Sequence, residues 1–467
     1  MLFLAINLVC FAFDFFYIAA LPIVPLFLYL LFHHTDKVIY FLAFATPISI
    51  PLKDIGAGIG MSVPTEPIIV MLFAGVLFKL ISGKTFDIHI LKNPIVVVAL
   101  INMLWLYITS ISSTHGIVSM KYSLAYTWYV AVFLLTLSHF FKNEKSISIF
   151  IWCFAIATTF LTLYTLKNHA AESFTRLYAY TAMRPFLPDH GMYAAAISFA
   201  IPPMLVIALF GSKMRVNPFW QTVAAGIALI VLLGVIFSFT RASWLSIIIA
   251  FGVWGLLWLK VKFKTVATVG ISIFAVFLLF QSLIFSELSR NKQDSDDDIT
   301  AHLQSFSNIS TDPSNLERLN RWSCVYRMFQ DKPILGFGPG TYTYEYGSYQ
   351  LPYEMTIIST NSGDLGNVHS EYLRPFVESG FVGGILFLIL VIVTIQQGFL
   401  VYYEAANIRI KGLVLGCLLG LITYFVHGLL NNYSEFDKIA VPMWGFMAVI
   451  VAARRYHLRE EKKEPAM

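Results

Sequence analysis

The chain has 467 residues, of which 57% are hydrophobic and only 13% are charged. Soluble domains carry about 25% charged residues, so this composition excludes an ordinary soluble protein. The net charge of +5 comes from basic residues in short loops rather than from one continuous patch, which argues against a nucleic-acid partner.

Long apolar runs recur along the chain and predict transmembrane α-helices, because a closed β-barrel would show shorter alternating strands. The runs lie at 2–18, 19–33, 37–50, 64–82, 93–111, 120–141, 146–166, 190–210, 220–240, 242–259, 264–284, 376–402, 409–430 and 438–454. The first three are short and contain Asp14 and several prolines, so they are candidates for kinked or partial spans. We therefore expect an all-α polytopic membrane protein with 12–14 transmembrane helices. The first run lacks a basic region and a cleavage site, which indicates an uncleaved span rather than a signal peptide.

Lysine and arginine are concentrated in alternate loops between these runs. They occur at Lys84, Lys92, Lys142, Lys145, Lys213, Arg215, Lys260, Lys262, Lys264, Arg409 and Lys411, and in the tail at Arg454, Arg455, Arg459, Lys462 and Lys463. Under the positive-inside rule these loops and both termini are cytoplasmic, and 285–375 is a large external loop. The chain then divides into an N-terminal transmembrane bundle (1–284), the external loop with a candidate catalytic helix (285–375), and C-terminal transmembrane helices with a tail (376–467).

The external loop has two unlike halves. Its first half contains the acidic run Asp294–Asp298, which could hold a divalent cation but is more typical of a solvated loop. In the second half, Asp312 as N-cap and Pro313 as first residue predict a helix that ends near Pro333. Its expected apolar face is formed by Leu316, Leu319, Trp322, Val325, Tyr326 and Phe329.

Arginines on the external side are the first candidates for chemistry. Arg241 stands between two apolar runs with almost no loop, where a charge is costly and usually faces a cavity or a partner. A guanidinium binds phosphate through two parallel hydrogen bonds, so Arg241 is a candidate phosphate ligand; the alternative is an arginine that extends to lipid headgroups. Arg318 and Arg321 are expected to leave the predicted helix by a more polar face, either toward an anion or simply toward water, with Arg318 stacking on Trp322.

His369 precedes the apolar run at 376–402 and is a candidate general base, since imidazole ordinarily titrates near neutral pH. The alternative is a capping or interfacial histidine. Glu371, Arg374 and Glu378 follow at spacings of three and four residues, and an ordinary ion-pair ladder at a helix entry explains them.

Other polar residues fall on the same side of the predicted bundle. They are Arg176, Arg184, Asp189 and His190 in one loop, and Asn431, Asn432 and Glu435 in another; both groups could line a cavity or anchor the interface. The glycines from Gly336 to Gly340 follow a helix rather than a strand and lack the Lys-Ser/Thr ending of a nucleotide loop, so they indicate a tight turn. The cysteines Cys10, Cys153, Cys324 and Cys417 suggest neither disulfides nor zinc.

These motifs occur in an order seen in one family. They are Thr240-Arg241-x-x-Trp244, Arg318 four residues before Trp322, the glycine turn from Pro333 to Tyr342, and His369-Ser370-x-x-Leu373 with Glu378-x-Gly380. Over about 230–390 the chain resembles the bacterial O-antigen ligase and polymerase superfamily.

The resemblance implies a helical membrane fold of the GT-C type with a large periplasmic loop, in the bacterial inner membrane. It implies transfer of a glycan from undecaprenyl diphosphate to an acceptor such as the lipid A core, without a cofactor or metal ion. By position, Arg241 and Arg318 would bind the donor diphosphate and His369 would act on the acceptor, with Arg321 and either Arg176 or Arg184 as further basic residues. Trp322, Tyr342 and Glu378 would support them.

Related functions stay open at this point. Family members often have asparagine after the histidine, and Ser370 stands there in this chain, so the acceptor is undecided between the lipid core, a second lipid-linked glycan and a protein. A polymerase needs room for two diphosphates, and Arg176 with Arg184 could form the second site. A lipid-linked glycan flippase is the alternative class, but its polar residues would be expected near the middle of the membrane.

Overall fold

The structure is a computed structural model that describes residues 33–52, 61–82, 87–270, 313–356 and 366–458, with isolated positions at 25, 29–31, 272, 359 and 360. The apolar run at 2–18, most of those at 19–33 and 264–284, the acidic run Asp294–Asp298 and the predicted N-cap Asp312 lie outside the described residues. The expectations for those segments therefore stay predictions.

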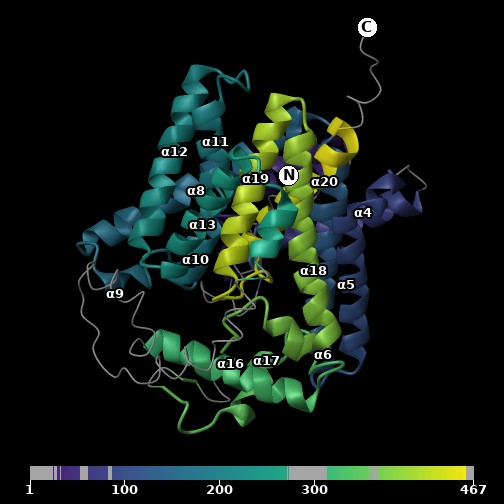
Figure 1. Ribbon diagram of the computed structural model, residues 1–467, viewed down its shortest axis with the longest axis vertical. Coiled ribbons are helices and arrows are strands. Elements are labelled where there is room, and N and C mark those ends of the chain that lie inside the picture. The colour runs from purple at the N-terminus through teal and green to yellow at the C-terminus, as the bar shows by residue number, and fades with distance from the viewer. Residues whose placement is uncertain are drawn as a thin grey trace, which may run out of the picture.

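Within the described chain, nine helical segments are long and apolar enough to cross a membrane. They are α5 (Pro94–Ile111), α6 (Gly116–Tyr129) continued by η4 (Val130–Thr136) and α7 (Leu137–Phe140), α8 (Glu144–Ala171), α10 (His190–Ser198) with α11 (Ile201–Phe210), α12 (Pro218–Phe237), α13 (Arg241–Trp258), α18 (Arg374–Glu404), α19 (Ile408–His427), and α20 (Asp437–Ala452) with η6 (Ala453–His457). These nine correspond to nine of the fourteen predicted runs. The helical prediction is confirmed for them, and they form an upright bundle (Figure 1).

Two further runs form shorter helices than the sequence predicts. The run at 37–50 is α3 (Thr35–Ala45), with 11 residues, and the run at 64–82 is α4 (Thr65–Ile81), with 17 residues. At 1.5 Å per residue α3 is about 16 Å long, too short for a hydrocarbon core of about 30 Å. Between them β1 (Ile50–Pro51) pairs antiparallel with β2 (Ser62–Val63), a small departure from the expected all-α fold.

The helices α19 and α20 are buried along most of their length and form the centre of the bundle. Glycines allow this close packing, as expected where helices associate in a membrane. A Cβ atom on Gly416 would lie 2.6 Å from the Cα atom of Pro203, so α19 and α11 approach too closely for any larger residue.

A small cap lies across one end of the bundle, where Figure 1 shows α16 (Pro313–Asp331) and α17 (Tyr342–Glu345) below the long helices. The cap has its own core, which it shares with the first turn of α18; it consists of Val325, Met328, Phe337, Tyr342, Tyr346, Val368 and Val377. The cap and the bundle are thus joined at the start of α18.

The glycine turn fastens the cap to the bundle. Gly336, Gly338 and Gly340 all have positive φ angles, of 68°, 113° and 76°, which glycine adopts without a steric penalty. The N–H of Gly338 donates to the Glu378 carbonyl over 2.8 Å. A Cβ atom on Gly336 would lie 2.5 Å from that same carbonyl oxygen, so a larger residue would separate the turn from α18. The prediction of a tight turn is confirmed.

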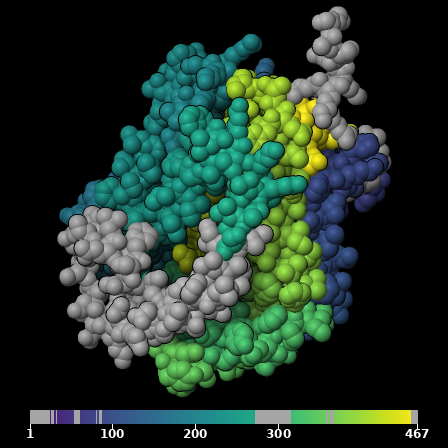
Figure 2. Space-filling model, in the orientation of Figure 1, coloured from purple at the N-terminus to yellow at the C-terminus, as the bar shows by residue number. Residues whose placement is uncertain are grey.

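The basic loops that the sequence places on one side contact one another at the end of the bundle opposite the cap. Arg455 pairs with Asp87 over 2.8 Å, and Arg409 pairs with Glu144 over 3.3 Å, so the basic loops come together there. Figure 2 shows this end, with η6 in yellow, far from the green cap. The basic loops and the cap therefore occupy opposite ends of the molecule.

Candidate active site

Polar residues from five segments converge at the cap end of the bundle. His190 is the first residue of α10, Arg241 is the first residue of α13, and His427 is the last residue of α19. Arg318 lies on α16, and His369 lies in the loop before α18. Each residue therefore lies at the cap end of a helix, in the loop before α18, or on the cap itself, outside the apolar part of the bundle.

Arg241 is held in place by its neighbours in the chain. The preceding Phe239 has a φ angle of +52°, which bulky residues rarely adopt. Thr240 contacts His190 through its hydroxyl, over 3.2 Å to Nδ1, and Ser243 Oγ lies 2.9 Å from His427 Nδ1. The start of α13 is thus tied to both histidines, and Arg241 itself is half-buried between these two contacts.

Arg318 reaches from the cap to the turn after α19. Its Nε donates to the Leu430 carbonyl over 3.1 Å, and its Nη1 donates to the Asn315 side chain over 3.2 Å. The side chain is half-buried, so a bound molecule has access to it. The helix begins at Pro313 and ends before Pro333, as the sequence predicts.

His369 has two unusual features for a residue in a loop. Its φ angle is +55°, in a region where strain of about 1–3 kcal/mol is typical and often marks a functional site. Its Nδ1 atom is buried and has no hydrogen-bond partner among the described residues. Buried polar atoms are rarely left without a partner, so this nitrogen is a candidate for contact with a bound molecule.

The charge state of His369 differs from the sequence expectation of near-neutral titration. Burial lowers its pKa to about 4, and the positive charges of Arg318 and Arg321 add to this effect. The ring is therefore neutral at pH 7. The expectation was wrong because the sequence does not show how deeply the cap covers this loop.

The network around His427 was missed by sequence reasoning. His427 lies inside an apolar run, is 1% exposed, and contacts Ser243 through Nδ1 and Asn431 through Nε2, over 2.9 and 3.0 Å. The Asn431 amide donates to Nε2, so Nδ1 carries the proton and donates to Ser243. A histidine in a predicted membrane span was the available signal, because such residues usually face a partner or a cavity.

The predicted helix face of α16 needs a correction. Arg321 does not face water: it is 2% exposed, and its Nε donates to Glu317 over 2.6 Å. Its guanidinium also stacks on Tyr346 at 3.9 Å. Burial alone would raise the pKa of Glu317, but hydrogen bonds from Ser359 and the charge of Arg321 outweigh it and hold that pKa below its usual range. The buried face of α16 contains this ion pair, whereas Tyr326 of the predicted apolar face is 64% exposed.

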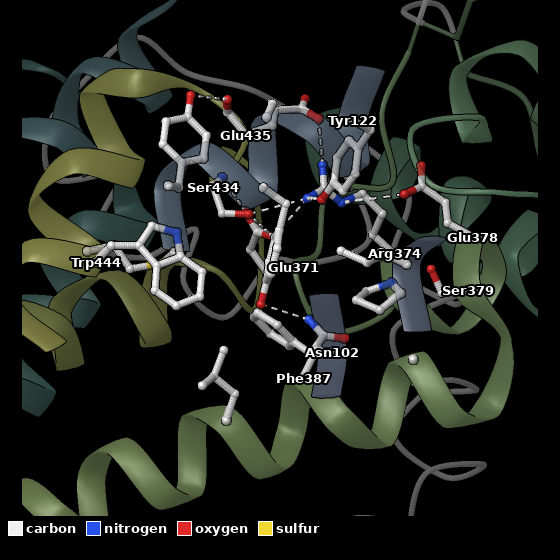
Figure 3. Close-up of a pocket in the computed structure, with 18 residues that line it drawn as sticks. Asn102, Tyr122, Glu371, Arg374, Glu378, Ser379, Phe387, Ser434, Glu435 and Trp444 are labelled. Carbon is white, nitrogen blue, oxygen red and sulfur yellow. Dashed lines mark hydrogen bonds and ion pairs between the residues drawn. The ribbon is translucent and has the colours of Figure 1, made fainter. Parts of the chain in front are cut away.

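The predicted ladder after His369 exists but is not an ordinary surface ladder. Arg374 lies within 3.5 Å of Glu371 and 3.9 Å of Glu378, and all three are at most 4% exposed. A third carboxylate, Glu435, approaches Arg374 to 2.9 Å from the turn before α20. Figure 3 shows the Arg374 side chain among these groups, beside a cavity of about 60 Å³ that also borders Trp444.

The three predicted supporting residues belong to the cap and its attachment. Tyr342 is 1% exposed, its hydroxyl donates to the Arg321 carbonyl over 3.1 Å, and its N–H donates to Glu378 Oε1 over 3.3 Å. Trp322 packs against the cap core, and its buried Nε1 has no partner within the described structure. These residues hold the cap and do not line the cluster of histidines.

The two loop arginines are separated by the fold. Arg176 is half-buried and lies near enough to His190 for its charge to act on that ring, as does Arg318, which places Arg176 near the cluster. Arg184 has an exposed side chain, and its carbonyl accepts a hydrogen bond from Tyr164 over 2.8 Å. Of the two candidates, Arg176 is therefore the one that the fold brings to the site.

Residues 226–388 match the family model described as O-antigen ligase. The similarity to the O-antigen ligase family thus covers a central region that is less than half of the chain. It is also 24% identical over 296 residues to a protein of Rickettsia conorii (strain ATCC VR-613 / Malish 7) that bears the name "Putative polysaccharide ligase". That alignment covers 62% of this chain and 63% of the relative, so the chain spans less than two thirds of the relative's length.

The matched region contains part of the cluster. Arg241, Arg318 and His369 lie within the matched residues, whereas Arg176 and His427 lie outside them. The matched region therefore contributes the residues from α13, α16 and the loop before α18, and the flanking helices α10 and α19 complete the cluster around it.

Proposed function

We propose that this membrane protein transfers a glycan from a polyprenyl diphosphate, undecaprenyl diphosphate in a bacterium, to a hydroxyl group of an acceptor at the cluster described above. The observation that carries the proposal is the unsatisfied, buried Nδ1 atom of His369 beside the half-buried Arg318. The first could take a proton from the acceptor, and the second could bind the diphosphate of the donor.

Arg318 and Arg241 are the proposed diphosphate ligands, with Arg176 as a third. Guanidinium groups bind phosphate oxygens in pairs and stay ionised. Accessibility separates these arginines from Arg321 and Arg374, which are 2% and 4% exposed and enclosed by carboxylates. Only a partly exposed guanidinium can meet a ligand without breaking a buried ion pair.

The proposed step is a single displacement at the anomeric carbon. The acceptor oxygen forms a bond to that carbon, the bond from carbon to the phosphate oxygen breaks, and the lipid diphosphate leaves with the bonding electrons. The acceptor proton passes to Nδ1 of His369. Negative charge grows on the departing oxygen, so arginines placed there stabilise the transition state more than the bound donor. One displacement inverts the configuration of the anomeric carbon.

Donor binding would also prepare His369 for this role. In the free protein the charges of Arg318 and Arg321 help to keep its pKa at about 4, which makes it a weak base. A bound diphosphate would offset the charge of Arg318 and raise the pKa of the imidazole. The His369 imidazole would therefore be a stronger base when the donor is bound, and it would take up protons less readily while the site is empty.

The placement of the cluster favours transfer over transport. Its residues stand at the first residue of α10 and α13 and at the last residue of α19, whereas a transporter is expected to bind near the middle of the membrane. Arg176 joins the same cluster as Arg318, and Arg184 is exposed elsewhere. One cluster favours a ligase with one diphosphate site over a polymerase with two. The lipid A core is the proposed acceptor, with a protein or a second lipid-linked glycan as alternatives.

We propose that the cap end faces the periplasm, with the basic loops in the cytoplasm. Single cysteines at Tyr353 on the cap and at Lys262 at the other end, in a variant without native cysteines, would test this. Tyr353 is 82% exposed. An impermeant thiol reagent should label the Tyr353→Cys variant, and not the Lys262→Cys variant, in intact spheroplasts; the reverse pattern would refute the orientation.

The deciding experiment is transfer by the purified protein in lipid nanodiscs, with an undecaprenyl-diphosphate glycan and three separate acceptors: lipid A core, a second lipid-linked glycan and a protein. Product formation that needs His369 would support the proposal, and the productive acceptor would identify the subclass. Transfer in the presence of EDTA tests the metal-free mechanism. An absence of transfer to all three acceptors by a protein that moves the donor across vesicles would instead establish a flippase.

A further inference from the structure

A second polar cavity lies at the end opposite the cap, where the start of α5, the end of α18 and η6 meet. Its volume is about 360 Å³. It is lined by His89, Ile90, Lys92, Asn93, Pro94, Leu400, Glu404, Arg454, Arg455 and Leu458. The 31 residues of α18 separate it from the cap end by roughly 45 Å, at 1.5 Å per residue. The proposed transfer site therefore does not explain it.

The cations around this cavity are not all neutralised in the same way. Arg455 forms two hydrogen bonds with Asp87, over 2.8 and 3.2 Å, and the bonds from Arg455 lower the pKa of that carboxyl to about 2. Arg454 differs from Arg455, because its Nη1 is buried and meets no hydrogen-bond acceptor in the described part of the chain. A buried donor on a charged group is costly when unsatisfied.

The charge balance points to an anion. Among the described residues around the cavity, Lys92, Arg454 and Arg455 contribute three positive charges, and Glu404 and the adjoining Asp87 contribute two negative charges, which leaves an excess of one positive charge. The η6 segment is a π-helix, a form that is often found at functional sites. Arginine binds phosphate through paired hydrogen bonds, so a phosphate group matches both the excess charge and the Nη1 atom that meets no acceptor among the described residues.

We propose that this cavity binds a phosphate-bearing anion through Arg454 and Lys92. Three membrane-spanning segments begin or end at its rim, so it lies at the depth of lipid headgroups. The phosphate therefore belongs either to an anionic phospholipid or to a soluble phosphate ester. Basic pockets between transmembrane helices are a known type of site for anionic headgroups.

The test uses the full-length protein in a neutral detergent. Short-chain phosphatidylglycerol, short-chain phosphatidylcholine and glycerol phosphate are titrated separately, and binding is read from the dissociation constant and from the unfolding midpoint, which rises when a ligand binds the folded state. Saturable binding of phosphatidylglycerol alone identifies a lipid site. Saturable binding of glycerol phosphate identifies a site for soluble esters.

Two variants and one control make the assignment specific. Arg454→Gln and Lys92→Gln should each weaken binding about tenfold, the effect of losing one charged hydrogen bond. Lys92 is exposed, so its replacement should not disturb folding. Arg409→Gln, which removes a cation paired with Glu144 at the same end but outside the cavity, should leave binding unchanged. The proposal is wrong if no probe binds saturably, or if Arg409→Gln weakens binding as much as the two cavity variants.

Discussion

Two charged clusters lie on either side of the start of α18, and they differ in how their arginines are used. On one side, Arg374 is 4% exposed and lies near three carboxylates, with Glu371 also accepting hydrogen bonds from Tyr433 and Ser434. On the other side, Arg318 is half-buried and donates to a backbone carbonyl and an amide oxygen, close to His369. His369 and Arg374 are five positions apart in the sequence.

This difference indicates that the cluster around Arg374 stabilises the fold, whereas the cluster around Arg318 can bind a ligand. A buried guanidinium surrounded by carboxylates offsets the free-energy cost of its desolvation through those ion pairs, and removing one partner leaves an uncompensated buried charge. A partly exposed guanidinium is accessible to a ligand, and the histidine beside it has a ring nitrogen that meets no hydrogen-bond partner among the described residues. The predictions that follow test this division, beginning with the largest effect.

The largest loss of activity should come from the histidine. His369→Ala should lower the rate of transfer roughly 10²–10⁴-fold, the usual contribution of a proton acceptor, while the donor still binds. The rate is measured with purified protein and the lipid-linked donor, and donor binding is measured separately. His115→Ala is the matched control, because His115 is also at the cap end but pairs with Glu345 over 3.3 Å. If His369→Ala loses donor binding and keeps its rate at saturation, His369 is a donor ligand rather than the base.

On the structural side, Arg321→Ala should cost about 3–5 kcal/mol of stability, because it leaves Glu317 buried without its partner. The unfolding midpoint of the purified protein measures the change. Replacing both partners with methionine should recover much of the loss, since a buried ion pair can often be exchanged for apolar residues. A stable Arg321→Ala protein with a large loss of transfer would place Arg321 in the binding cluster and break the division.

Much of the architecture could be predicted from the sequence because hydropathy and loop charge are local signals. These signals predicted nine apolar runs, the helix from Pro313 to Asp331 and the turn at Gly336. The orientation of α16 could not be predicted from these signals. Its pattern of apolar residues suggested that Arg321 faces water, but Glu317 and Thr360 accept hydrogen bonds from the buried guanidinium, and Ser359 donates to Glu317.

The candidate site was predictable only in part, for a related reason. Arg241 and His369 were recognisable because each is an unusual residue close to an apolar run, and Arg318 because it lies four residues before Trp322 on the predicted loop helix. His427 and Ser243 were missed, since each is inside or next to a run and their contact joins residues 184 positions apart. The spacing predicted that Glu371 and Glu378 pair with Arg374, but it could not predict Glu435, which reaches Arg374 from the turn before α20.

A smaller loss of activity should follow from replacing the accessible arginines with lysine. Arg318→Lys and Arg241→Lys keep the charge but lose the planar fork, so each should lower transfer by up to about 10²–10³-fold, the effect of removing one oriented donor from a transition state. Arg184→Lys is the matched control and should transfer at the normal rate, because Arg184 is exposed away from the cluster. Normal transfer in both Arg318→Lys and Arg241→Lys would exclude a diphosphate site at these arginines.

The smallest effect, and the most direct test of the link between the arginines and the histidine, is a shift in pH dependence. Burial first, and then Arg318 and Arg321, keep the pKa of His369 at about 4 in the free protein. Imidazole accepts a proton only when it is neutral, so kcat/KM, which reports the free protein, should fall only as the pH drops toward 4. A bound diphosphate offsets the charge of Arg318, which raises the pKa, so kcat should fall at a higher pH than kcat/KM. Arg318→Gln removes one of the lowering charges and should move the acid limb of kcat/KM upward as well. If the acid limbs of kcat and kcat/KM coincide in the wild type, and the acid limb of kcat/KM does not shift in Arg318→Gln, then no diphosphate binds near His369. The distinction between a structural cluster and a ligand-binding cluster would then have no functional basis.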